Sequence, residues 1–146
     1  MHNFNSSLKA GQIGEAAFAA AFPHLKKLSG YQSDFVNPRT GATYEIKTDK
    51  RSTMQTPNIF IEILSNKEKG TVGGPAQAVQ HGTDYWIYCF ADKVAFMFNT
   101  KRLAAWVNAN KDAYVHINIY NETWITTGIL VQRTKIAHLA KKVLLK

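Results

Sequence analysis

YQSDFVNPRTGATYEIKT, residues 31–48, predicts two short strands joined by a turn. The segment between them, residues 37–41, is Asn-Pro-Arg-Thr-Gly, and all these residue types except arginine are common in turns. Because side chains alternate along a strand, Glu45 and Lys47 share one face of the second strand. Folding the two strands into a hairpin brings Asp34 level with Glu45. The stretch therefore predicts two carboxylates and a lysine at one place.

Two carboxylates and an ammonium group in this arrangement suit the hydrolysis of a phosphodiester. Mg²⁺ prefers oxygen ligands and is commonly held by one or two protein carboxylates, while waters and substrate phosphate complete its shell. Such an ion acidifies a water molecule and neutralises the charge that grows on the phosphate. Lys47 can position the attacking water or stabilise the pentavalent phosphorus.

Asp34, followed by Glu45-Ile46-Lys47, resembles the signature of the PD-(D/E)xK nuclease superfamily, which includes restriction enzymes, Holliday-junction resolvases and phage exonucleases. Ser33 stands at the position of the proline in the family's name, which many members lack. The resemblance implies that Asp34, Glu45 and the Ile46 main-chain carbonyl bind Mg²⁺, for which Mn²⁺ would substitute. It also implies that Lys47 orients or activates water, and that cleavage leaves 5′-phosphate and 3′-hydroxyl ends.

The resemblance extends to the amino-terminal part of the chain. Members often carry a further acidic residue on a helix, and Glu15 lies in a helix expected over residues 7–22, where it would complete the outer shell of the site. The implied fold is α/β, with a restriction-endonuclease-like core over residues 7–90 and a central mixed sheet of four or more strands flanked by helices. Residues 58–64 would supply the third strand and residues 83–90 the fourth, after a crossover helix.

Composition and charge set bounds on domain number and partner. A chain of 146 residues, 45% of them hydrophobic, predicts a single nuclease-like domain over residues 1–146. Lys and Arg outnumber Asp and Glu by 18 to 10, and the net charge of +8 favours a polyanionic partner, although a basic charge of this size also serves solubility. We expect DNA, and branched DNA first, because a chain this compact has no separate domain for reading a long sequence. The sequence does not distinguish a DNA from an RNA substrate, or endonuclease from exonuclease action.

Several residues outside the motif are candidate contacts to the nucleic acid. Two follow the second strand directly, two lie in a glycine-rich segment at residues 65–75 that we expect to be a flexible loop, and one lies on the crossover helix. They are Lys50, Arg51, Lys67, Lys69 and Gln77. A final helix expected over residues 134–145 carries further lysines, which either contact the DNA backbone or form a solvated face.

Each candidate also has a purely structural interpretation. Glu45 and Lys47 can be charges that keep an edge strand from pairing, and Asp34 can be a solvated acid near a turn. Glu62, a carboxylate inside an apolar strand, is either an outer ligand or lysine partner, or a residue at the rim of the fold. The alternative function is a non-catalytic nucleic-acid-binding module on the same fold.

The remaining sequence features exclude other chemistries. The single cysteine, Cys89, excludes an internal disulfide and a multi-cysteine zinc site, and the five histidines show no ligand spacing. The sequence shows neither a secretion signal nor an apolar run of membrane-spanning length, so we expect a cytoplasmic protein, in the host cytoplasm if phage-encoded, with no membrane partner. A two-fold symmetric junction would suit a homodimer, which no residue requires.

Overall fold

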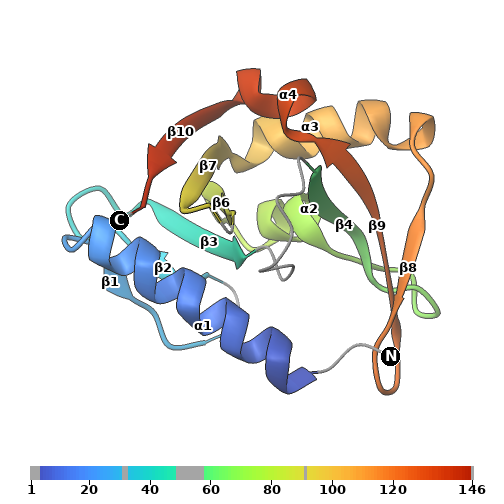
Figure 1. Ribbon diagram of the computed structural model, residues 1–146, viewed down its shortest axis with the longest axis horizontal. Helices are drawn as coiled ribbons and strands as arrows, with labels where there is room; N and C mark the ends of the chain where they lie inside the picture. Colours follow the sequence, from blue (N-terminus) through green and yellow to red (C-terminus); the bar gives the residue numbers. More distant parts are fainter. Residues whose placement is uncertain (1–3, 31–32, 49–57, 91, 146) are drawn as a thin grey trace.

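The computed structural model describes residues 4–30, 33–48, 58–90 and 92–145, with the backbone alone for residues 4–11. It is built around two sheets (Figure 1). The six-stranded sheet has the order β1-β2-β3-β6-β7-β10, formed by Lys26–Lys27, Phe35–Val36, Thr43–Thr48, Tyr85–Cys89, Val94–Asn99 and Ala140–Leu144. The four-stranded sheet has the order β5-β4-β9-β8, formed by Thr71–Val72, Asn58–Asn66, Ile125–Gln132 and Ile117–Tyr120. The helices are α1 (Phe4–Ala21), α2 (Gly74–Gln80), α3 (Thr100–Asn110) and α4 (Arg133–Ile136), so the predicted α/β class is confirmed.

The predicted hairpin is present in the six-stranded sheet. β2 and β3 pair antiparallel with Phe35 opposite Tyr44, and the Asn37 N–H closes the turn by donating to the Ala42 carbonyl at 2.8 Å. Gly41 has a φ of +79°, a left-handed conformation that glycine adopts without a steric penalty. The first strand is shorter than predicted, at two residues, and positions 31 and 32 lie outside the described part of the chain.

The predicted fourth strand, residues 83–90, forms β6 inside the six-stranded sheet. β6 lies between β3, to which it is parallel, and β7, to which it is antiparallel, so the sheet is mixed. A parallel neighbour requires a crossover connection, and the chain between β3 and β6 contains α2. This helix begins with Pro75 in its first turn, as predicted, and is followed by Gly82 at a φ of +75°.

Each face of the six-stranded sheet contributes to a separate apolar core. On one face, the fully buried Phe18 of α1 packs with Tyr44, Ile46 and Ile87. The opposite face, which includes Trp86, is covered by the four-stranded sheet and α3 as well as by α2, so helices alone do not flank the sheet. Within the described residues, no helix is both long and apolar enough to cross a membrane.

The predicted third strand forms, but in the other sheet. β4 pairs with β9 and β5, not with the strands of the predicted core. Its residues Ile59 and Ile61 are fully buried in the core between the two sheets. Alternating apolar residues show that a strand has a buried face, but the strand it pairs with comes from far along the chain, so its place in the central sheet was predicted wrongly.

The prediction of a flexible loop at residues 65–75 is also wrong. This segment completes β4, turns, forms β5 and enters α2. Gly73 and Gly74 are buried, and a Cβ on Gly73 would lie 2.0 Å from Oε1 of Glu62. The two glycines therefore permit close packing against β4 rather than loop closure over a ligand.

The final predicted helix, residues 134–145, is replaced by three short elements. α4 is followed by a 3-10 turn, Ala137–Leu139, and then by β10, which pairs with β7 along five residues. Pairing satisfies main-chain groups of β7 that a helix would leave open, and this outweighs the helical spacing of the apolar residues. Lys141 and Lys142 are exposed on the resulting edge strand, where lysines discourage edge-to-edge association.

Candidate active site

The two motif carboxylates meet at the edge of β3, next to the residue that precedes β2. Asp34 immediately precedes β2, and its N–H donates to the Tyr44 carbonyl at 2.8 Å, which continues the pairing and sets Asp34 opposite Glu45. Its Oδ2 accepts a hydrogen bond of 2.7 Å from the Ile46 N–H. The Asp34 side chain therefore binds a main-chain N–H of β3 that a longer β2 would otherwise have bound.

Glu45 lies beside Asp34 and is half-buried. Its paired residue on β6 is Trp86, which is 2% exposed and belongs to the core between the sheets. Burial, above all, raises the pKa of Glu45 to about 8; the Lys47 ammonium opposes this shift, and a side-chain hydrogen bond with Asp34 adds to it. Glu45 thus tends to keep its proton near neutral pH.

The oxygen atoms around this pair suit a hard divalent cation. The N–H and C=O of a strand residue point to the same edge, so the Ile46 carbonyl faces the side of β3 on which Asp34 lies. Two carboxyls and one carbonyl form an all-oxygen donor set, as Mg²⁺ prefers. A bound cation would favour the ionised form of Glu45, against the burial that raises its pKa. Asp34, Glu45 and Ile46 therefore fit the predicted ligand roles.

Lys47 and Glu45 lie on the same face of β3, as strand alternation predicts. Lys47 is exposed, and its charge lowers the pKa of Glu45, which shows that its ammonium acts on the carboxyl pair. The lysine is free to reach a water or phosphate bound at the pair.

Glu15 approaches the pair from α1 but is held by a residue that the sequence did not single out. Its Oε2 lies 2.8 Å from Nζ of Lys27 on β1, and its charge still contributes to the raised pKa of Glu45. The α1 helix packs closely on β3 at Gly14, because a Cβ on this residue would lie 1.8 Å from Oγ1 of Thr48. Lys27 stands outside any recognisable motif, and β1, which carries it, pairs with β2 so that Lys27 is opposite Phe35.

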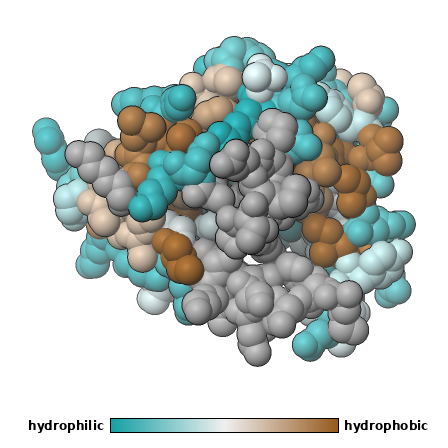
Figure 2. Space-filling view, viewed as in Figure 1, coloured by the Kyte–Doolittle hydropathy of each residue, from teal (hydrophilic) through white to brown (hydrophobic). Residues whose placement is uncertain are grey.

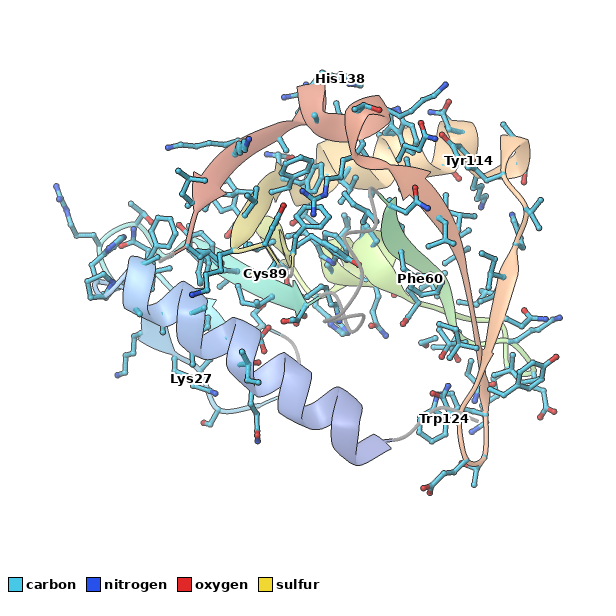
Figure 3. The ribbon with its side chains drawn as sticks, viewed as in Figure 1. Lys27, Phe60, Cys89, Tyr114, Trp124 and His138 are labelled. Carbon is cyan, nitrogen blue, oxygen red and sulfur yellow. The ribbon has the colours of Figure 1, made fainter. Side chains whose placement is uncertain are left out.

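The described residues contain no group of three or more His, Cys, Asp or Glu side chains that could hold a metal ion. Among the described residues, Asp34 and Glu45 are the acids whose side chains meet at the motif, and Glu15 forms an ion pair with Lys27. The buried Cys89, whose pKa is raised to about 12 by burial, has no nucleophilic character near neutral pH. Cys89 is a small buried side chain on β6 (Figure 3).

The predicted nucleic-acid contacts are not gathered at this site. Lys50 and Arg51 lie outside the described residues. Lys67 and Lys69 are exposed in the β4–β5 turn, which lies beside the β8–β9 hairpin because the Lys67 N–H donates to the Ile125 carbonyl at 2.8 Å. This turn and the β2–β3 hairpin lie at opposite sides of the molecule in Figure 1.

Two other predicted residues lie on α2 and β4. Gln77 is half-buried on α2, and its N–H donates to the Gly73 carbonyl at 3.3 Å. Glu62 lies on β4 with its side chain against Gly73. Hydrophobic residues gather at the right of the view in Figure 2 and also at its upper left.

No protein-family model matches this sequence, and a search of curated proteins finds none that is similar to it. The function is therefore argued from the geometry of the site and from the motif.

Proposed function

We propose that this protein is a metal-dependent DNA endonuclease that hydrolyses phosphodiester bonds. The observation that carries the proposal is the contact between Asp34 and Glu45, with the Ile46 main chain and the Lys47 ammonium beside it. Two ionised carboxylates are seldom in contact on a protein surface, because the repulsion between like charges destabilises the fold. A pair held together by a hairpin is expected where a cation is to be bound.

Each residue has a distinct task in the proposed reaction. Asp34, Glu45 and the Ile46 carbonyl would hold Mg²⁺, and Mn²⁺ would substitute for it. When bound, the ion supplies a water of lowered pKa and a positive charge next to the phosphate. Lys47 orients that water and stabilises negative charge on the phosphorus oxygens, and Glu15 borders the site.

The order of elements supports a restriction-endonuclease-like core and the PD-(D/E)xK resemblance. The family is expected to have a helix with an acid, a strand at the aspartate, a strand with Glu-x-Lys, and a fourth strand that follows a crossover helix. In this chain they are α1, β2, β3, α2 and β6. The four-stranded sheet is then an addition to that core.

DNA is the proposed substrate because of the net charge of +8, and a branched, resolvase-like substrate is the first choice within that class. A two-fold junction would be cut symmetrically by a homodimer, so dimerisation is part of this proposal. We place the protein in the cytoplasm, where both DNA and Mg²⁺ are present.

The test is cleavage of supercoiled plasmid and of a labelled four-way junction by purified wild type, Glu45→Gln and Glu122→Gln. Glu122 is an exposed acid in the β8–β9 turn and is the matched control. Wild type and Glu122→Gln should cut with Mg²⁺ or Mn²⁺ and not with EDTA, whereas Glu45→Gln should be inactive. Equal cutting by Glu45→Gln would refute the proposed site, and salt-sensitive binding without cleavage in every metal condition would establish the binding module instead.

A further inference from the structure

The outer edge of β8 differs from the other sheet edges in the described part of the chain. The two sheets end at β1 and β10 and at β5 and β8. β1 consists of two lysines, β10 carries the exposed Lys141 and Lys142, and β5 is only two residues long. Exposed lysines and short length are common protections of an edge strand against pairing with another chain. β8, Ile117–Tyr120, has four residues, none of them charged, so it has neither protection.

The hairpin that contains β8 is also nearly free of charge. Residues 113–132 include one formally charged side chain, Glu122, although charged residues make up 19% of the chain. Two copies of a chain with a net charge of +8 repel each other over most of their surfaces. The β8–β9 hairpin is therefore a part of the molecule that a second copy can approach with little repulsion.

The main chain of β8 directs hydrogen-bonding groups away from its own sheet. In an antiparallel pair, residues that bond to the neighbouring strand alternate with residues whose N–H and C=O point to the other edge. The Ile125 carbonyl accepts from the Lys67 N–H at 2.8 Å, so the main chain of Ile125 faces β4. Its partner on β8, Tyr120, therefore faces the outer edge, and so does Asn118, two residues earlier. Among the described strands, none pairs with β8 on that edge.

Exposed apolar side chains lie at both ends of this edge. Val115, shortly before β8, is 82% exposed, and Tyr120, its last residue, is 58% exposed. Ile119 is half-buried, on the face of the sheet opposite that of Tyr120. Figure 1 shows β8 at the margin of the molecule. A second copy paired at this edge would remove apolar surface from water on both faces of the sheet.

We propose that β8 is the dimer interface of this protein, where it pairs antiparallel with β8 of a second copy. A two-fold axis beside Ile119 sets Asn118 of one chain opposite Tyr120 of the other, so the two outward residues of each chain exchange N–H···O=C bonds. The two four-stranded sheets then form one continuous sheet. The inference deepens the proposed function, on which it rests for the use of a dimer, and the metal site takes no part in it. Because a pair of four-residue strands is a small interface, the dimer should form in a concentration-dependent way.

The first experiment is sedimentation equilibrium of wild type, Tyr120→Pro and Tyr120→Thr over a range of protein concentrations. Proline at position 120 removes an N–H that points to the outer edge and leaves the bonds to β9 intact, so the variant should fold. Threonine removes the aromatic ring and keeps that N–H, which makes Tyr120→Thr the matched control. Wild type and Tyr120→Thr should approach twice the mass of the chain as the concentration rises, whereas Tyr120→Pro should keep the mass of one chain.

The second experiment gives a positive signal in a protein whose β8 edge is intact. In the proposed pair Ile119 lies opposite Ile119 of the second copy, with Cβ atoms about 4.5–5.5 Å apart. Ile119→Cys should therefore form a disulfide-linked dimer under a mild oxidant, since a small shift brings the two sulfur atoms within bonding distance. Leu144→Cys, an exposed position on the edge strand β10, should cross-link much more slowly. The native Cys89 is buried and should not contribute.

The outcomes separate this inference from the function on which it rests. A wild type that stays monomeric at every concentration would overturn the interface, and so would a folded Tyr120→Pro that dimerises as wild type does. If Tyr120→Pro does not fold, Ile119→Cys decides, and cross-linking no faster than that of Leu144→Cys would overturn the interface. If the protein is monomeric and folded Tyr120→Pro, unlike Tyr120→Thr, loses affinity for a labelled four-way junction, the edge contacts nucleic acid instead of a second copy. A dimer that cuts no DNA in any metal condition would refute the proposed function and leave the interface standing, and a monomeric wild type that cuts DNA would do the reverse.

Discussion

Glu45→Gln should make the metal-free protein less sensitive to alkaline pH. In the folded protein Glu45 retains its proton up to a pKa of about 8, whereas in the unfolded chain the proton is lost near 4.5. A group whose pKa is raised on folding stabilises the fold fully below the unfolded pKa, and that contribution is lost as pH rises through the folded pKa. The free energy of unfolding of wild type should therefore fall between about pH 4.5 and pH 8 relative to the variant, whose side chain carries no charge at any of these pH values.

The magnitude follows from the same two pKa values. One pKa unit corresponds to about 1.4 kcal/mol, so a rise from 4.5 to about 8 sets a ceiling of about 5 kcal/mol. Hydration of the half-buried carboxylate reduces this amount, and we expect a relative loss of about 2–4 kcal/mol between pH 5 and pH 9. Saturating Mg²⁺ should restore the stability of wild type at pH 9 and leave Glu45→Gln unchanged, because only a ligand that binds the folded state stabilises it.

The assay is urea unfolding in EDTA, followed by tryptophan fluorescence at pH values from 5 to 9. Trp86 is 2% exposed and adjoins Glu45 in the sheet, so its emission should report unfolding of this region. The slope of the free energy with urea concentration must stay the same for both proteins if the two are to be compared. Parallel pH curves for wild type and Glu45→Gln would refute the reasoning, since they would mean that folding does not change the proton affinity of Glu45.

Three further predictions concern the site and its supports. The Mg²⁺ affinity measured by calorimetry should rise by up to about tenfold per pH unit until about pH 8, because the cation must displace the Glu45 proton; an affinity independent of pH would contradict this. Gly14→Ala should lower Tm and activity, although alanine is the better helix former by about 1 kcal/mol, because its Cβ would lie 1.8 Å from Oγ1 of Thr48; an unchanged Tm in a thermal melt would show that α1 does not pack so closely. In urea unfolding, Gly74→Ala should lower the free energy of unfolding by several kcal/mol and Gly70→Ala by only about 1–2 kcal/mol. Both glycines have a positive φ, but of these two only Gly74 would bring a Cβ against backbone, 2.1 Å from the Glu62 carbonyl oxygen. Equal losses would refute the close approach.

Local signals in the sequence accounted for the centre of the site. The turn residues at 37–41 and the two-residue alternation of β3 are short-range properties, and they suffice to place Asp34 opposite Glu45 with Lys47 on the same face. The apolar run that became β6 was long enough to indicate its central position. The identity of a bound metal and the reaction itself remain proposals that rest on this local arrangement.

Contacts with segments far away in the chain decided the structure of two regions that local sequence signals predicted wrongly. Residues 140–144 have apolar residues at helical spacing, yet they form β10 because β7 offers main-chain groups that a neighbouring strand satisfies. The glycines at 73 and 74 suggest mobility when considered alone, but the approach of β4 makes them packing residues.

The sequence by itself determined the β2–β3 hairpin and the acids and lysine that it presents, because turn preference and side-chain alternation act over a few residues. Only the tertiary structure decided that β4 belongs to a second sheet and that Lys27 holds Glu15, because both depend on which segments far apart in the chain come into contact. Lys27, which belongs to no motif, meets Glu15 because the fold brings β1 next to α1.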